Sequence, residues 1–232
     1  MKSRLSKTIT DIQSSRIIRA AACGVVFIAC AASTLALTSH QETKPAAPSA
    51  NGSSSSAAAA TFTVDDTHSM SLFRVTHMGA GRFWGRFNEI SGTAQYAPDS
   101  TLALDITIAV SSVDCANKKL DGHLKSPDFF NAVEYPTMKF VSTGAKSLGA
   151  GRFDVTGNLT IHGVTKPITV PIECSPVVVM GGAARAGFET TFEIKRSDFG
   201  MNYGVEHGAV SDETRVIVSL ECVDKSKAPA NP

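Results

Sequence analysis

The stretch TLALDITIAV, Thr101 to Val110, alternates apolar and polar side chains over its whole length. One set of alternate positions is Leu102, Leu104, Ile106, Ile108 and Val110, and the other is Thr101, Ala103, Asp105, Thr107 and Ala109. Successive side chains of a β-strand point to opposite faces, so this pattern predicts a strand with one buried face and one solvated face.

The same alternation recurs along the chain. Clear examples are Phe153, Val155, Leu159 and Ile161, then Phe188, Phe192 and Ile194 opposed by Glu189 and Glu193, and a last strand with Val216, Val218, Leu220 and Cys222. Shorter signals are Thr61 to Val64, Ser69 to His77, Arg82 to Tyr96, Thr137 to Lys146 and Thr165 to Cys174. We therefore expect about eight or nine strands separated by glycine-rich turns.

One segment has helical spacing instead. DCANKKLDGHLKSPDFF places Leu120 and Leu124 four residues apart, with Asp114 or Asn117 as the N-cap and Pro127 as the stop. A single short helix among many alternating strands favours a closed barrel or a sandwich over repeated βαβ units.

The segment GNLTIHGVTKPITV, Gly157 to Val170, predicts two strands joined at HGVTKP. Gly163 permits a positive φ, and Pro167, which has no N–H donor, suits the beginning or the edge of a strand. We interpret His162 as a corner residue whose imidazole bonds backbone groups, rather than as a catalytic or metal-binding group.

No catalytic motif accompanies these strands. His68, His77, His123 and His162 form no i, i+4 pair and no H-E-x-x-H, and the chain has no G-x-S-x-G, P-loop or complete G-x-G-x-x-G. Convergence of the histidines in three dimensions stays open. We expect a protein that is not an enzyme and that needs no metal or cofactor, with a hydrolase as the weakest alternative.

The N-terminal region predicts export. Five basic residues, the last of them Arg19, precede the uncharged run from Ala20 to Leu37, so residues 1–37 are either a signal peptide or an uncleaved membrane anchor, with lipidation at Cys30 as a third alternative. Residues 38–60 have a disordered-linker composition, 61–223 form the β-domain, and 224–232 are a flexible tail. The domain is expected on the extracytoplasmic side, in the periplasm, secreted or tethered to the membrane.

The charge balance and the cysteine spacing bear on the binding partners and the disulfides that the chain can have. With 22 basic and 21 acidic residues and no basic block outside the N-terminus, the chain is not expected to bind nucleic acid. Cys115, Cys174 and Cys222 lack C-x-x-C spacing, so at least one is unpaired within a monomer, and a disulfide between the last two stays open. A homodimer is not excluded.

Several segments together resemble the YceI family of exported, lipocalin-like proteins. They are DDTHSMSLFRVTHMGAGRFWGRFNEISG, HLKSPDFFNAVEYPTMKF, GNLTIHGVTKPITV and RAGFETTFEIKRSDFGM, in that order between Thr61 and Val223. The resemblance implies an eight-stranded antiparallel barrel with a short helical insertion and an elongated apolar cavity for long isoprenoid or related amphiphilic lipids. It implies mainly structural roles for the motif residues His68, His77, His123, Asp128, Phe129, His162, Arg185, Arg196 and Asp198.

The predicted function is an exported binding protein for such a lipid, serving carriage, storage or stress protection. The residues expected to line the cavity are Phe73, Val75, Phe87, Leu104, Ile106, Ile108, Phe129, Phe140, Phe153, Val155, Phe188, Phe192 and Ile194. The alternative is a β-domain that fills its own interior and acts through surface protein contacts. The apolar segment Val177 to Met180 departs from the family pattern and predicts either a strand extension or a lip at the cavity mouth.

Overall fold

The computed structural model describes residues 58–224 and 226. The predicted targeting segment and most of the predicted linker and tail lie outside these residues. Within the described part of the chain, no helix combines the length and the hydrophobicity that crossing a membrane requires.

The domain consists of strands, one α-helix and two short 3-10 turns. In chain order they are β1 (Ala60–His77), β2 (Gly81–Phe87), β3 (Ile90–Ala97), β4 (Thr101–Ala109), η1 (Val110–Ser112), β5 (Val113–Asp114), α1 (Lys118–Leu124), β6 (Thr137–Gly149), β7 (Arg152–Ile161), β8 (Val164–Cys174), β9 (Val178–Met180), β10 (Ala183–Lys195), η2 (Arg196–Phe199) and β11 (Glu213–Asp224).

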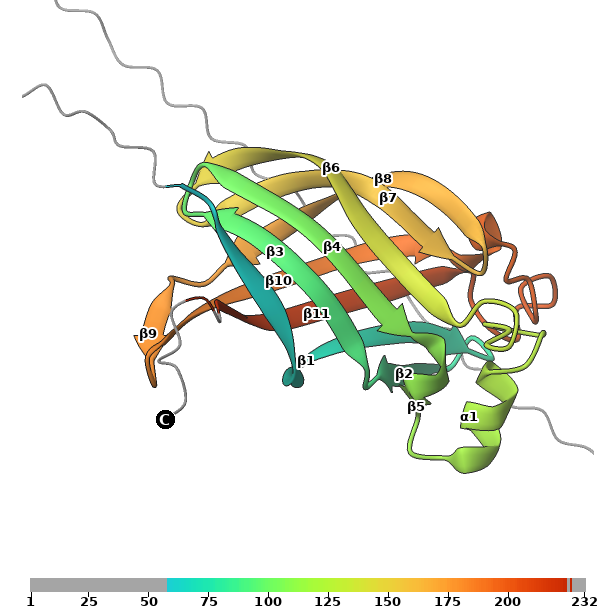
Figure 1. The fold of residues 1–232 in the computed structure, drawn as a ribbon. Helices are drawn as coiled ribbons and strands as arrows, with labels where there is room; N and C mark the ends of the chain where they lie inside the picture. The colour runs from blue at the N-terminus through green and yellow to red at the C-terminus, as the bar shows by residue number, and fades with distance from the viewer. Residues whose placement is uncertain (1–57, 225, 227–232) are drawn as a thin grey trace, which may run out of the picture. The chain divides into compact units, whose positions relative to one another are not determined.

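Eight strands form a closed antiparallel barrel (Figure 1). Their order around the barrel is β1, β3, β4, β6, β7, β8, β10 and β11, and the circle closes because β1 also pairs with β11. The predicted eight-stranded barrel is therefore confirmed. A closed barrel leaves one face of every strand inside, which explains the alternation in the sequence.

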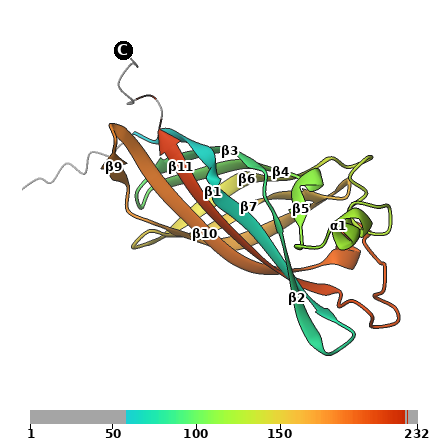
Figure 2. The same cartoon turned by 90° about the horizontal axis from the view of Figure 1, so that it is seen from below.

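The first strand is longer than the sequence pattern suggested. The predicted strands at Thr61 to Val64 and Ser69 to His77 are one strand, β1, whose pairing with β11 is irregular between Asp65 and Met70. The signal at Arg82 to Tyr96 is instead divided between β2 and β3. The β1–β2 hairpin extends past the barrel on the side of α1 (Figure 2).

The predicted helix is confirmed and is short. Its N-cap is Asn117 rather than Asp114, because Asn117 Oδ1 accepts hydrogen bonds from the backbone N–H groups of Lys119 and Leu120. The helix ends at Leu124, before Pro127. It packs next to β5 at one end of the barrel, where its leucines face the interior.

The buried side chains form two clusters at different levels of the barrel. One cluster includes Phe62, Tyr96, Phe153 and Phe188, and it fills the end where β3 meets β4 and β9 lies. The other includes Phe73, Phe87, Leu124 and Met138 near α1. The first end is packed shut, so any internal space must open elsewhere.

Gly157 of β7 allows the ring of Phe140 to lie across the strand. A Cβ at position 157 would stand 2.5 Å from Phe140 Cζ and 2.7 Å from the carbonyl oxygen of Val141. We expect Gly157→Ala to lower the free energy of unfolding by about 1–3 kcal/mol, because backbone and ring must both shift.

Chemical denaturation measures this effect, and Gly144→Ala is its control. A Cβ at Gly144 of β6 would meet no atom within 4 Å, so that variant should stay within about 0.5 kcal/mol of the parent protein. Equal stabilities of the two variants would contradict the close packing at Gly157.

Candidate ligand-binding cavity

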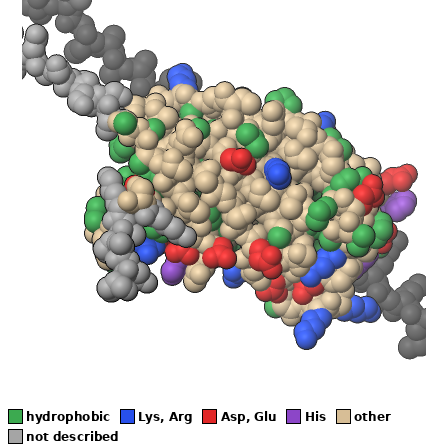
Figure 3. Space-filling model, in the orientation of Figure 1, with side chains coloured by type: hydrophobic (Ala, Val, Ile, Leu, Met, Phe, Trp, Pro, Cys, Tyr) green, Lys and Arg blue, Asp and Glu red, His purple; other side chains and the backbone are tan. Residues whose placement is uncertain are grey.

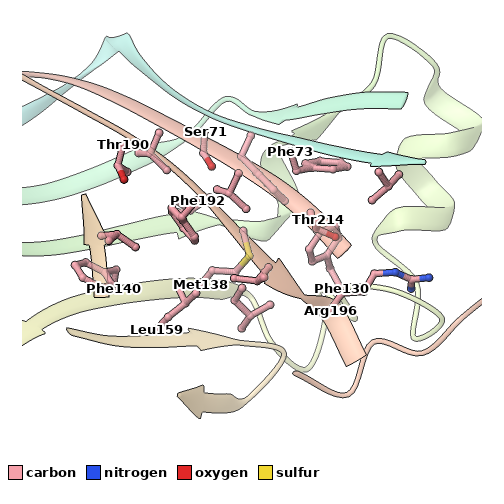
Figure 4. A pocket seen from close by; sticks show the side chains of 18 of the residues that line it. Ser71, Phe73, Phe130, Met138, Phe140, Leu159, Thr190, Phe192, Arg196 and Thr214 are labelled. Carbon is pink, nitrogen blue, oxygen red and sulfur yellow. The ribbon is translucent and has the colours of Figure 1, made fainter. Parts of the chain in front are cut away.

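An apolar cavity of about 470 Å³ lies inside the barrel (Figure 4). Side chains from several strands and from α1 line it, and Phe140, Met138 and Phe192 point into it. Its volume is in the range of small-molecule sites in proteins. Its walls are mostly hydrocarbon, so the arrangement can remove an apolar molecule from water.

The closed end of the cavity is an aromatic plug. The ring of Tyr96 makes edge-on contacts with Phe188, at 5.2 Å between centroids, and with Phe153, at 6.4 Å. Burial raises the pKa of Tyr96 to about 12, so the phenol is neutral at physiological pH. The plug sets the depth to which a ligand can reach.

The other end carries α1, the segment after it, and the β1–β2 hairpin. Phe130 stands edge-on to Phe87 at 5.2 Å and to Phe73 at 6.1 Å. His77 and Arg82 also line the cavity, at the end of β1 and the start of β2. A polar head group at this mouth would meet cationic and imidazole groups, while an apolar tail would lie among the rings.

Most of the residues predicted to line the cavity do line it. They are Phe73, Val75, Phe87, Leu104, Ile106, Ile108, Phe129, Phe140, Phe188, Phe192 and Ile194. Phe153 and Val155 do not: they are 1% and 0% exposed and belong to the packed end of the barrel. Ligand contact by any of these residues stays a prediction.

The sequence prediction omitted other residues that line the cavity. They include Leu120, Leu124, Phe130, Met138, Leu159, Ile161, Ile168, Thr190, Thr214, Val216, Val218 and Leu220. The alternation of β11 already marked Val216, Val218 and Leu220 as inward. The contribution of α1 carried no such signal, because a two-residue helical stripe does not show which surface it covers.

His162 occupies the tight turn between β7 and β8, as predicted. Its φ is 50° and that of Gly163 is 74°, values that a two-residue hairpin turn requires. The predicted hydrogen bonds to the backbone are wrong for Nε2, which is buried without a partner. The ring instead packs on Tyr135, with 4.6 Å between centroids.

We expect His162→Gln to leave isoprenoid affinity within about threefold of the parent, a change below 1 kcal/mol, because the side chain is part of a turn and does not line the cavity. Titration with a fluorescent isoprenoid checks the affinity. Elemental analysis of both proteins is the second readout, and a stoichiometric metal lost in the variant would show that the turn assignment is incomplete.

Two of the other motif histidines, His123 and His68, make local pairs. His123 Nε2 lies 3.0 Å from Asp128 Oδ2, and its ring contacts Phe129 and Tyr203. His68 Nδ1 lies 2.9 Å from Asp65 Oδ2. The first pair joins α1 to the segment after it, and the second lies in the irregular stretch of β1, in keeping with the structural roles that the family resemblance implied.

Asp65, His68 and Glu221 place their ligand atoms within 4.8 Å of one another. Arg185 Nη1 bonds both carboxylates, at 3.4 Å to Asp65 and closely to Glu221. The hydrogen bond between Asp65 and His68 lowers the pKa of Asp65 and raises the pKa of His68. The guanidinium of Arg185 therefore balances the negative charge of Asp65 and Glu221.

Arg196 is a buried, positively charged residue that lines the cavity. It is 4% exposed, and its guanidinium donates hydrogen bonds to the carbonyl oxygens of Met201, Tyr203, Val210 and Ser211. These four acceptors belong to the segment between η2 and β11. One side chain therefore holds that segment against the barrel.

The apolar segment after β8 forms β9, which pairs with Ala183–Arg185 of β10. The predicted strand extension is confirmed. A lip at the cavity mouth is wrong, because β9 lies at the packed end, opposite α1 (Figures 1 and 2).

Cys115, Cys174 and Cys222 are all free thiols. Burial raises the pKa of Cys115 and of Cys174 to about 11, and that of Cys222 to about 12. A disulfide between Cys174 and Cys222 is not formed. Their thiols are protonated at neutral pH and are therefore poor nucleophiles.

Figure 3 shows one face of the domain, on which acidic side chains lie along the lower edge and basic side chains are scattered. This face presents no extended basic area of the kind that binds a polyanion.

Comparison with known proteins places this geometry in a family. The model of the YceI-like domain matches residues 62–222. Protein YceI of Escherichia coli O157:H7 is 36% identical over 181 residues, covering 75% of this chain and 92% of the relative. A UPF0312 protein of Azotobacter vinelandii is 34% identical over 175 residues, covering 72% and 88%.

Solved structures share the fold. BcnA of Burkholderia cenocepacia matches with a TM-score of 0.60 at 29% identity, covering 68% of this chain and 98% of the other. A polyisoprenoid binding domain from Saccharophagus degradans matches with a TM-score of 0.56 at 19% identity, covering 72% and 98%. The shared barrel, the matched domain and the identity to these relatives show that the chain belongs to the YceI family.

Proposed function

We propose that this protein binds a long-chain isoprenoid or a similar amphiphilic lipid, with its tail in the barrel cavity. The observation that carries the proposal is the apolar cavity of about 470 Å³ between the aromatic plug and α1. The solved domain from Saccharophagus degradans, which has the same fold, is described as polyisoprenoid binding and supports the ligand class.

The energetics favour such a ligand. Each methylene removed from water contributes about 0.8 kcal/mol, while ordering a flexible chain opposes binding. An isoprenoid tail is branched and partly unsaturated, so it has fewer rotatable bonds per carbon than a saturated chain. Phenylalanine and isoleucine side chains along the wall suit that irregular outline, and the plug limits tail length.

Binding rather than catalysis is the proposed activity, because the walls offer hydrocarbon contact along most of the cavity. Carriage, storage and stress protection are all compatible uses of a sequestered lipid. A barrel that fills its own interior and works only through its surface is disfavoured by the open volume inside it.

We also propose that the domain works on the extracytoplasmic side. The support is the run of five basic residues followed by the uncharged stretch Ala20 to Leu37. Protease added to intact spheroplasts should cleave the segment before the barrel. Cleavage only after lysis would place the domain in the cytoplasm.

Titration with geranylgeraniol carrying a fluorescent anthraniloyl group tests the proposed ligand class. We expect saturable binding of one probe per protein, displaced by unlabelled geranylgeraniol and far less by the shorter geraniol, because buried tail length sets the affinity. Binding that does not saturate, or displacement that ignores tail length, would refute an isoprenoid tail in the cavity.

A further inference from the structure

Among the neighbouring strands of the barrel in the described residues, β8 and β10 pair over the shortest stretch, and we call the gap between them the seam. These strands pair only at Phe188↔Cys174 and Glu189↔Glu173. On its other side β10 pairs with β11 without a break from Ala184 to Lys195, and β8 pairs with β7 along almost its whole length. The seam is therefore open from Glu173 and Glu189 toward the mouth end.

Two prolines explain why β8 does not pair further. The N–H of Cys174 donates to Gly151 on the β7 side, and the N–H of Ser175 donates to Gly187 on the β10 side. Backbone direction alternates along a strand, so Pro171 and Pro167 lie at positions that face β10. Neither has an N–H to donate, and proline in a sheet marks an edge.

The cavity lies directly behind this seam. Ile168 and Val170 of β8 and Phe192 and Ile194 of β10 all line it. Ile168 and Ile194 also line a second, open groove, whose other walls are Lys166, Pro167, Glu193, Lys195, Asp198, Phe199 and Glu213. The two isoleucines are thus shared between the interior and the outer surface.

In the described part of the chain, one side-chain hydrogen bond and one ion pair lie across the open part of the seam. Thr190 Oγ1 donates to the carbonyl oxygen of Pro171 at 2.6 Å, next to the paired end. Lys166 Nζ lies 3.5 Å from Asp198 Oδ1, near the mouth. Both members of this ion pair are about half exposed, and such pairs contribute little to stability, so this contact opposes separation of the strands only weakly.

We infer that this seam is a lateral portal through which the lipid tail enters and leaves the barrel. The inference rests on the proposed lipid-binding function and adds the route. A slot along the wall lets a long tail move sideways while staying against apolar side chains. Threading the same tail end-on through the mouth would expose more of it to water during transfer.

Closing the seam should slow exchange without changing affinity, because a portal alters the barrier and not the two end states. The double variant Pro167→Val, Pro171→Val restores both N–H donors toward β10. We expect association and dissociation of anthraniloyl geranylgeraniol to slow about tenfold each, with the dissociation constant within about threefold. Pro98→Val, in the exposed turn between β3 and β4, is the matched control and should exchange at the parent rate.

A covalent closure makes the test independent of how well valine pairs. Extending the register from Glu173↔Glu189 places Thr169 opposite Glu193, and both are exposed. Thr169→Cys with Glu193→Cys, introduced into the otherwise unchanged protein, is closed by a disulfide or by a short bis-maleimide, confirmed by peptide mass spectrometry. The native thiols Cys115 and Cys174 are partly buried and Cys222 is buried, and the same peptide mass spectrometry checks that none of them has reacted.

The control cross-link joins Thr156→Cys to Thr169→Cys, whose parent hydroxyls lie 2.9 Å apart across the fully paired β7–β8 strands. Of the two cross-linked proteins, we expect slow exchange only in the one closed across β8 and β10, and we expect its disulfide form to return to the parent rate on reduction. Equal exchange rates in the open and closed forms would overturn the portal while leaving lipid binding intact. Loss of probe binding by the parent protein would instead overturn the proposed function, and the portal with it.

Discussion

A lysine on the inward face, in Ile106→Lys or Phe192→Lys, is expected to weaken binding of a fluorescent isoprenoid by about a hundredfold or more. Both side chains line the cavity, from β4 and β10. An ammonium group there lacks a partner, keeps water around it and opposes an apolar tail. Titration gives the affinity, and circular dichroism confirms that each variant is folded.

The outward neighbours provide the matched controls. Thr107 and Thr191 follow or precede the test residues by one position and so point to the other face of the same strands. Thr107→Lys and Thr191→Lys should bind within about threefold of the parent protein. If folded inward and outward variants bind equally, the cavity is not the binding site.

The second large effect is expected at Arg196. Replacing it by methionine keeps the volume but removes hydrogen bonds to four backbone carbonyls in the segment from Met201 to Ser211. We expect the free energy of unfolding to fall by about 3 kcal/mol or more, because several buried acceptors lose a charged donor together. Chemical denaturation measures the loss.

Arg196→Lys separates charge from geometry. Lysine keeps the positive charge but cannot reproduce the planar fork that reaches four carbonyls, so it should restore only part of the lost stability. Met201 and Val210 also line the cavity, and lipid affinity should fall along with stability in both variants. Full stability of Arg196→Met would show that the segment is held by other contacts.

The alternation of apolar and polar residues predicted the strands, but it could not show that they close into a barrel. The alternation of Leu104 and Ile106 identifies a half-buried strand, and the resemblance of four separated segments supplies the barrel. Alternation cannot show that Asp65 begins an irregular stretch inside one long strand, because that break depends on pairing with β11. The residue types from Asp114 to Pro127 did predict the helix, but they left its N-cap open between Asp114 and Asn117.

The sequence predicted an apolar cavity inside the barrel, but it could not predict how far that cavity extends. Phe153 and Phe192 both belong to alternating runs, yet one is sealed in the packed end and the other faces open space. The difference depends on Tyr96 and Phe188 meeting from distant strands, which no local pattern records. Pro167 was predicted to lie at the beginning or the edge of a strand, and its place along the open seam could be found only from the register of β8 and β10.

The most direct test of lipid binding is mass spectrometry of an organic extract from protein purified without detergent. We predict close to one isoprenoid or similar long-chain amphiphile per barrel in the parent protein and in Thr191→Lys, and almost none in Phe192→Lys. A folded parent protein whose extract holds no such lipid, and whose cavity takes up no anthraniloyl geranylgeraniol when it is supplied, would contradict the account.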